Sequence, residues 1–213
     1  LRETGDSLLP DDTAKARKHI DKAIAENVSS TDVYGLNILV RTMNTALIAA
    51  GEMGLRRESV LAILLAHLVI GKHCALKEIR ADFGADAANI IHGLVKVQEV
   101  YAKSATVNSE NFRSLLLTFA EDLRVILILI AERLYLMRVA KSLSDEHRLQ
   151  IAAEVSYLYA PLSHKLGLYK IKSELEDLSL KFQDRETYDY IAQKLNETKR
   201  SRDQYIAEFT EPI

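Results

Sequence analysis

The chain is 213 residues long and 48% of it is hydrophobic, so it can bury a full core without disulfide bonds. Its formal net charge of -2 excludes the broad basic field that drives non-specific binding to nucleic acid or anionic lipid. The single cysteine, Cys74, cannot form an internal disulfide, and the longest apolar stretch, residues 61–70, is about half the length that spans a bilayer. We therefore expect a globular cytoplasmic protein with no membrane span and no direct nucleic-acid binding.

The hydrophobic pattern is helical through most of the chain. Apolar residues recur at helical spacing, and the sequence holds only three prolines and eight glycines. The sequence therefore predicts an all-α protein, a bundle of many helices without a convincing strand. The expected helices span residues 11–26, 39–52, 56–70, 75–82, 85–101, 109–121, 123–142, 145–159, 161–167, 170–182 and 185–209.

Glycines and capping residues mark the short breaks between these helices. Gly51 and Gly54 flank the turn after the second helix, and Gly84 separates the fourth from the fifth. Asn108 or Ser109 supplies an N-cap for the helix expected over residues 109–121.

One apolar segment is ambiguous by its pattern alone. Residues 125–130 form a short, β-branched run that could equally be a buried strand. Asp122 precedes the run and Arg133 and Arg138 follow it, a charge order that suits a helix macrodipole. We therefore favour a helix and, because it is apolar on nearly all sides, expect it at the centre of the bundle.

The C-terminal part of the sequence suggests one break and one polar helix. We expect Pro161 to end the helix that carries Tyr157 and Tyr159, with a bend there, because proline lacks the backbone donor that an interior turn needs. The final helix is rich in charged residues, so it is either a solvated outer helix or a connection toward a missing domain. The chain starts at Leu1 rather than at methionine, and we interpret it as a piece of a longer protein.

Several short motifs in fixed order are more specific than any of these patterns. Together they resemble the hydrolase domain of RelA/SpoT proteins in order and spacing, over about residues 35–209. Five motifs carry the resemblance, and two shorter ones extend it upstream: Glu110–Arg113, Phe119–Val125, Ala131–Leu134 with Met137 and Arg138, Tyr159–Gly167 and Ile171–Leu178, preceded by Met53–Leu55 and Asp82–Gly84.

The resemblance implies a helical HD-type hydrolase fold and a multidomain parent. In that family, which serves the bacterial stringent response, a synthetase domain follows and transfers pyrophosphate from ATP to the 3′ hydroxyl of GTP or GDP. No such domain is present in these 213 residues. We divide the chain into an N-terminal helical segment (1–34), a hydrolase-type domain (35–183) and a polar helix leading toward a synthetase domain (184–213).

The metal ligands that the resemblance implies are largely replaced here. Active members carry a His-Pro pair, a His-Asp pair and an Asp in an Ala-Asp-Arg-Leu-His-Asn motif, which together bind Mn²⁺ to activate water. This chain has Thr42 for the first His, Ala66 and His67 for the His-Asp pair, and Glu132 for the last Asp. None of its six histidines is followed by Asp, so we expect no bound metal or other cofactor.

The groups that would handle the water are replaced as well. Ile70 and Gly71 stand where the family has a Glu-Asp pair, and neither can move a proton. Tyr135 and Leu136 stand where the family has His-Asn. We therefore predict no catalytic residues at these positions.

Two residues retain some ligand chemistry. His67 is either a remnant ligand or a hydrogen-bonded core histidine, and we favour the core role. Glu132 is either a ligand or a structural carboxylate with Arg133 as a simple partner, and we favour the structural role. His73 and Cys74 lie close to His67 in sequence but lack the spacing of a zinc site.

Basic residues at family positions suggest a nucleotide contact. They could hold the phosphates of a guanine nucleotide, or they could be ordinary helix ion pairs, and the sequence leaves both open. The candidates are Arg113, Arg138 and Lys165, with Arg124 at a further matching position.

The leading hypothesis is a hydrolase-dead regulatory domain that packs against the synthetase domain of its parent and shifts its on and off populations. The first alternative is an altered but working metal-dependent hydrolase that uses His67 and Glu132. The second is a sensor that binds a guanine nucleotide without chemistry.

Overall fold

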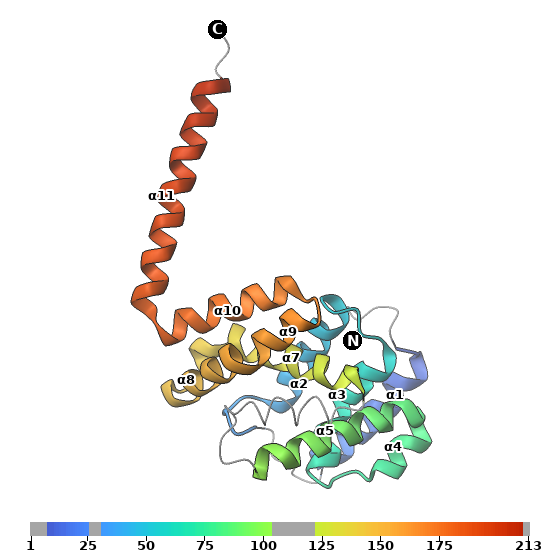
Figure 1. Cartoon of the computed structure of the whole chain (residues 1–213). Helices are drawn as coiled ribbons and strands as arrows, with labels where there is room; N and C mark the ends of the chain where they lie inside the picture. The colour runs from blue at the N-terminus through green and yellow to red at the C-terminus, as the bar shows by residue number, and fades with distance from the viewer. Residues whose placement is uncertain (1–7, 26–30, 104–121, 211–213) are drawn as a thin grey trace.

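The computed structural model describes residues 8–25, 31–103 and 122–210, and these form a helical bundle (Figure 1). Within these ranges there is no strand, only an isolated bridge between Thr31 and Asn37, so the all-α prediction is confirmed. The helix expected over 109–121 and its cap at Asn108 or Ser109 lie outside the described residues. The helices are α1 (Pro10–Ala25), α2 (Ile38–Gly51), α3 (Arg57–Ile70), α4 (Leu76–Phe83), α5 (Ala85–Lys103), α7 (Leu123–Arg138), α8 (Asp145–Glu154), α9 (Ala160–Lys165), α10 (Tyr169–Gln183) and α11 (Arg185–Thr210).

The core of the bundle lies where α2, α3, α5 and α7 meet. Helix α3 packs against both α2 and α5, and α2 packs in turn against α7. Most of α3 and α7 is buried, which confirms that residues 125–130 form a helix rather than a strand. Asp122 caps α7 by accepting a hydrogen bond from the backbone N–H of Arg124 (2.9 Å). A continuous apolar surface and a well-formed N-cap thus explain why the ambiguous segment is a helix.

The helices flanking this core follow from local signals. Helix α1 packs on α3, and its Ala16 and Ala23 are buried. Gly54 lies in the turn after α2 and Gly84 separates α4 from α5, as the sequence predicted, and their φ angles of 70° and 96° are ones that glycine adopts readily.

Pro161 does not end a helix, contrary to the prediction. Helix α8 continues as a π-helix over Val155–Tyr159 and then directly as α9, with Pro161 in its first turn. In the π segment the N–H of Ala160 donates to the carbonyl of Val155, one residue further back than in an α-helix. Because this wider turn shifts the hydrogen-bond register just before the proline, the helical backbone passes through it without a break.

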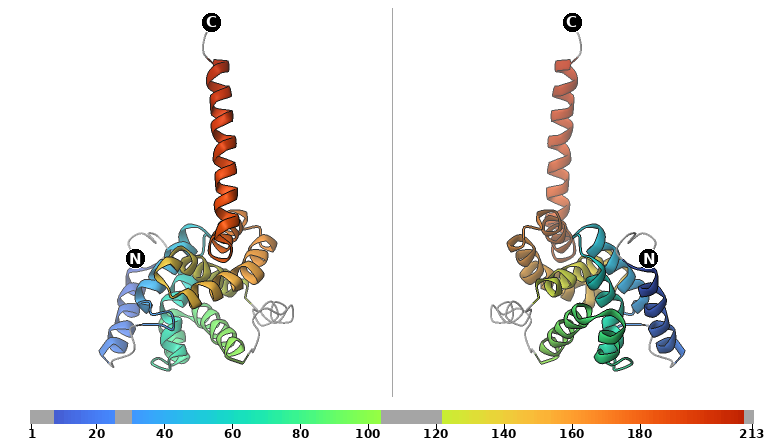
Figure 2. Two further views of the ribbon diagram at one scale, coloured as in Figure 1. Left: turned by 90° about the vertical axis from the view of Figure 1, so that its left-hand side faces the viewer. Right: turned by 90° about the vertical axis from the view of Figure 1, so that its right-hand side faces the viewer.

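Helix α11 projects from the bundle (Figures 1 and 2). It starts against α10 and carries a mostly exposed surface, which fits its polar sequence. No helix in the described part of the chain is both long and apolar enough to cross a membrane.

Candidate functional site

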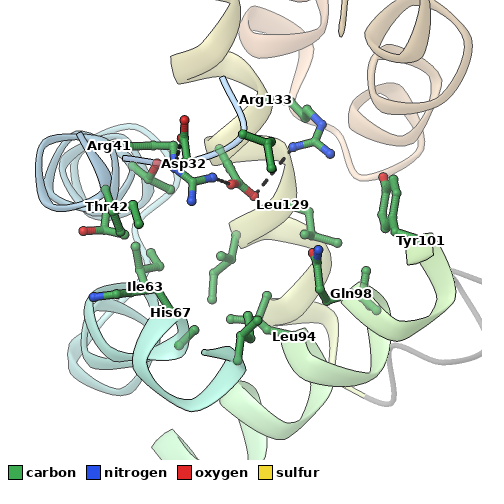
Figure 3. Close-up of a pocket in the computed structure, with 18 of the residues that line it drawn as sticks. Asp32, Arg41, Thr42, Ile63, His67, Leu94, Gln98, Tyr101, Leu129 and Arg133 are labelled. Carbon is green, nitrogen blue, oxygen red and sulfur yellow. Dashed lines mark hydrogen bonds and ion pairs between the residues drawn. The ribbon is translucent and has the colours of Figure 1, made fainter. Parts of the chain in front are cut away.

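A pocket of about 400 Å³ opens at the centre of the bundle, between α2, α3, α5, α7 and the loop before α2 (Figure 3). Aliphatic side chains form much of its wall, while Arg41, Glu132 and Arg133 bring charge to it. The aliphatic part comes from all four helices: Ile38, Ile63, Leu94, Val97, Ile128 and Leu129.

The pocket collects most of the positions that the sequence assigned to a degenerate site. They come from α2, from α3 and the residue after it, and from α7, so residues up to 90 positions apart in the chain surround one cavity. Tyr135 and Leu136 do not line it; Leu136 is fully buried in the core and Tyr135 is nearly so. The lining positions are Thr42, Ala66, His67, Ile70, Gly71 and Glu132.

The side chains at these positions do not fit a divalent metal. The hydroxyl of Thr42 donates a hydrogen bond to the carbonyl of Leu39 (3.1 Å), so it serves its own helix, and Ala66 has no donor atom. The carboxylate of Glu132 forms ion pairs with Arg41 and Arg133. Within residues 8–25, 31–103 and 122–210, no three His, Cys, Asp or Glu side chains are placed to hold a metal ion. The donor set therefore differs from the hard, carboxylate- and imidazole-rich set that Mn²⁺ prefers.

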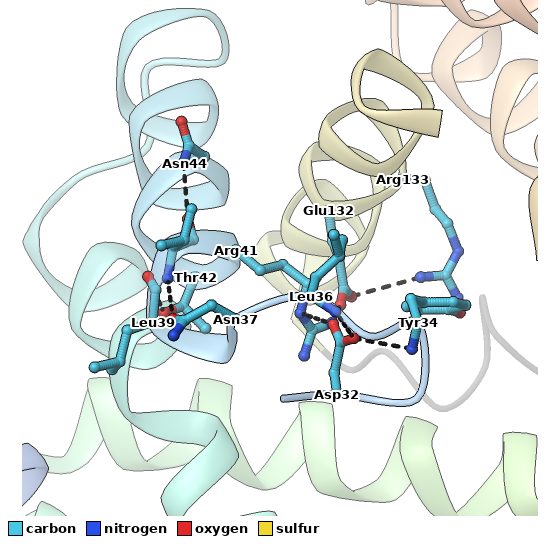
Figure 4. Close-up of polar contacts among 11 residues, drawn as sticks. Asp32, Tyr34, Leu36, Asn37, Leu39, Arg41, Thr42, Asn44, Glu132 and Arg133 are labelled. Carbon is cyan, nitrogen blue, oxygen red and sulfur yellow. Dashed lines mark hydrogen bonds and ion pairs between the residues drawn. The ribbon is translucent and has the colours of Figure 1, made fainter. Parts of the chain in front are cut away.

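Arg41 lies at the charged end of the pocket and binds two carboxylates (Figure 4). Its Nε atom is 2.9 Å from Oδ2 of Asp32, and its terminal nitrogen donates a short hydrogen bond to Glu132. Asp32 is held in place by its own loop, because its Oδ1 accepts the backbone N–H groups of Tyr34 and Leu36 (both 2.9 Å).

The sequence analysis missed both Arg41 and Asp32. The Asp32 turn closes through Gly35, which has a φ of 76°, and Asn37 then caps α2 through the N–H of Val40 (3.1 Å). This Asp-x-x-Gly pattern before an Asn cap is visible in the sequence and predicts a tight turn, but it does not reveal the partner on α7.

Arg133 extends this series of ion pairs into the core. Its NH1 atom is 3.7 Å from Oε2 of Glu132, and its NH2 atom is 3.2 Å from Oε1 of Glu154 on α8. The guanidinium also lies over the rings of Tyr101 and Tyr159, 5.7 and 5.2 Å from their centroids. Asp32, Arg41, Glu132, Arg133 and Glu154 thus alternate in sign and link the loop, α2, α7 and α8.

Two hydroxyl groups complete the environment of Glu154. Tyr101 donates a hydrogen bond to Oε1 of Glu154 (2.6 Å) and shares a second, short one with the hydroxyl of Tyr159. Burial raises the pKa of both tyrosines, so they remain neutral hydrogen-bonding groups. Burial disfavours the charge of Arg133, but the attraction of nearby acidic groups, Glu154 foremost, outweighs it, and the pKa of Arg133 rises.

His67 lines the opposite side of the cavity as a neutral imidazole. Burial, reinforced by the positive charges of Arg41 and His73, lowers its pKa to about 4. A neutral imidazole can bind a metal, but here the adjacent family position is Ala66, which contributes no ligand.

The imidazole ring of His73 lies close to Gly71. A Cβ atom there would lie 2.7 Å from Cδ2 of His73, so any side chain at this position would have to displace that imidazole. A carboxylate at this position would therefore require the ring of His73 to move.

Of the basic residues predicted to contact phosphates, those that the structure describes do not line the pocket. Arg138 pairs with Glu52 and Glu174 on the outside of the bundle, and Arg124 pairs with Asp122 at the start of α7. Lys165 is exposed at the end of α9 and does not line the pocket. Arg113 lies outside the described residues. Arg41 and Arg133 are instead the cations that line the cavity within the described ranges.

Cys74 belongs to a separate polar cluster. Its sulfur lies 3.5 Å from Nδ1 of His19, whose Nε2 is 2.7 Å from Asp82, an order that resembles a nucleophile, base and acid. However, burial and the neighbouring Glu78 raise the pKa of Cys74 to about 11, so the group is a thiol rather than a nucleophilic thiolate.

Comparison with known proteins agrees with this geometry. A family model described as an HD domain matches residues 16–169. A protein of Aquifex aeolicus named guanosine-3′,5′-bis(diphosphate) 3′-pyrophosphohydrolase is 33% identical over 174 residues, which are 82% of this chain and 25% of that protein. A GTP pyrophosphokinase of Myxococcus xanthus is 34% identical over 161 residues (73% and 21%). The bifunctional (p)ppGpp synthase/hydrolase SpoT of Escherichia coli K12 is 30% identical over 163 residues (76% and 23%).

The chain is a helical bundle whose pocket lies at the family's ligand positions, and the HD-domain model matches most of its length. The chain is therefore an HD domain. Its relatives place it more narrowly: it is an HD domain of the RelA/SpoT type. The chain spans about a quarter of the length of the curated relatives that it matches.

Proposed function

We propose that this HD domain is catalytically inactive as a hydrolase and acts as a regulatory domain of a longer RelA/SpoT-type protein of the bacterial stringent response. The observation that carries the proposal is the pocket itself. Its ligand positions hold Thr42 and Ala66, and its one remaining carboxylate at such a position, Glu132, is bound by Arg41. A guanidinium in that place neutralises the carboxylate but cannot accept the lone pair of a water molecule, so it cannot activate water as a metal does.

The regulatory part of the proposal rests on what the chain keeps. The core and the pocket are intact although their hydrolytic groups are replaced, which is expected if the surface of the domain, rather than its chemistry, is used. The relatives are about four to five times as long as the matched segment, and some carry pyrophosphokinase names. We propose that the partner is the synthetase domain of the same parent, and that packing against it shifts the parent between active and inactive populations.

One experiment tests the loss of hydrolysis. The chain is incubated with guanosine tetraphosphate and Mn²⁺, and pyrophosphate release is followed beside the Aquifex aeolicus hydrolase as a positive control. We expect no release above the rate without protein, because most of the family's metal ligands are replaced and Ile70 and Gly71 stand where its proton-transferring pair would be. Release that stops on chelation and in Glu132→Gln would contradict the proposal and favour the altered hydrolase.

A second candidate, a non-catalytic guanine nucleotide sensor, is favoured by the cavity of about 400 Å³ lined by Arg41 and Arg133. Both cations are already paired with carboxylates, so a polyphosphate would have to compete with Asp32, Glu132 and Glu154. Titration calorimetry of the same protein with guanosine tetraphosphate separates the two candidates. Saturable binding without turnover, lost in Arg41→Met, identifies a sensor.

A further inference from the structure

The charged end of the pocket is built around a single guanidinium. Arg41 joins Asp32 of the 31–37 loop to Glu132 of α7, which is 91 positions further along the sequence than Arg41, as Figure 4 shows. The side chains are largely withdrawn from solvent, with 18% of Arg41, 7% of Asp32 and 24% of Glu132 exposed. The three segments that form this side of the cavity are thus connected through one positive charge.

The two carboxylates need a cation between them. Two ionised carboxylates facing one site repel each other, and their desolvation adds to that cost. Glu132 has a second, longer contact with Arg133 (3.7 Å), and Arg133 is itself paired with Glu154. Among the ion pairs of the described residues, Arg41 is therefore the cation that Asp32 and Glu132 share.

We propose that Arg41 is a built-in cation that takes over the structural part of a metal ion's role in this pocket. Glu132 occupies a family ligand position, and the guanidinium meets its charge and fastens α2 and the 31–37 loop to α7. Because the cation is part of the chain, it cannot dissociate, so the pocket keeps its shape whatever the supply of divalent metal. This inference rests on the proposed loss of the metal site and adds what replaced it.

Thermal unfolding of the full chain tests the inference, and Arg138 provides a matched control. Arg138 also binds two carboxylates from other segments, Glu52 and Glu174, but on the surface. We expect the Tm of the unaltered chain to be the same with Mn²⁺ and with EDTA. Arg41→Met should lower the Tm by about 5–10 °C and Arg138→Met by less than about 3 °C, because only the first change removes the cation shared by two largely buried carboxylates.

Removing one of the stranded charges should reverse the effect. We expect Arg41→Met/Glu132→Gln to be more stable than Arg41→Met, and methylguanidinium at millimolar concentration to raise the Tm of Arg41→Met but not that of Arg138→Met. If Arg41→Met does not fold, the inference still requires the double variant to fold. An Arg41→Met loss no larger than that of Arg138→Met, a double variant less stable than Arg41→Met, or a Tm of the unaltered chain that rises with Mn²⁺ would each overturn the inference.

These readouts are independent of turnover. Pyrophosphate release by the unaltered chain would disprove the proposed function, whereas the stability of the variants decides the role of Arg41 without any nucleotide present.

Discussion

Arg41 and Arg138 make the same kind of contact in two different places. Each binds two carboxylates from distant segments, Arg41 at the pocket and Arg138 between Glu52 and Glu174. Around Arg138 the three side chains are 34 to 41% exposed, whereas those around Arg41 are 7 to 24% exposed. Water can replace the partner of a surface ion but cannot easily replace that of a buried one. Two arginines that each pair with two carboxylates can therefore contribute differently to stability.

The Arg133 side chain is 9% exposed, less than that of Arg41 or Arg138, and its removal should give the largest effect. Arg133→Met should lower the free energy of unfolding by about 3–5 kcal/mol, because Glu154 would remain buried without its charged partner. Urea unfolding at neutral pH measures the change. Arg185→Met on α11, whose partner Asp189 is 55% exposed, is the control and should change little. A loss below about 1 kcal/mol for Arg133→Met would mean that burial does not distinguish these pairs.

The protonation of His67, which lines the same pocket, should make the stability of the chain depend on pH. Its pKa is about 4 in the folded chain and about 6.5 when unfolded, so the unfolded chain binds the proton more tightly. The stability from the neutral form is complete above pH 6.5 and is lost as pH falls toward 4. We expect a loss of about 2 kcal/mol between about pH 7.5 and 5 from this group.

Urea unfolding at several pH values checks this prediction. His67→Gln should flatten the dependence on pH between these values, whereas His92→Gln, at an exposed position of α5, should leave it unchanged. An equal slope in the unaltered chain and in His67→Gln would show that His67 is not the group responsible.

Arg138 should give the smallest effect. Arg138→Met should cost less than about 1 kcal/mol at low salt, and less again in high salt, because exposed pairs are screened. Unfolding with and without added sodium chloride measures both. A cost that is large and insensitive to salt would place Arg138 with the buried cations and remove the distinction drawn above.

The fold was largely predictable from the sequence, and its exceptions have a physical cause. Periodicity and the charge order around residues 125–130 correctly favoured a helix, and Gly54 and Gly84 lie in the turns expected for them. Pro161 was misjudged because the π turn before it moves the hydrogen-bond register, and no residue preference in the sequence announces such a shift.

The site was predictable only where residues occupy family positions. Thr42, Ala66 and Glu132 meet in one pocket, as the resemblance implied. Arg41 and Asp32 escaped notice because an ion pair across 91 residues leaves no periodic signal, and charges near a helix start are usually solvated. Residue type shows which chemistry is missing from this pocket, but only the tertiary contacts show what took its place.

The projecting helix α11 converts small angles into large distances. It has 26 residues, so at about 1.5 Å per residue it extends about 39 Å. Its base is held firmly: Gln183 donates to the carbonyl of Ala152 (2.6 Å), and Asp184 caps α11 through the N–H of Thr187 (3.0 Å). A tilt of about 5° at this corner would move the far end of the helix by about 3 Å. A rearrangement too slight to disturb the packing of the bundle would thus be amplified into a displacement as large as a hydrogen bond.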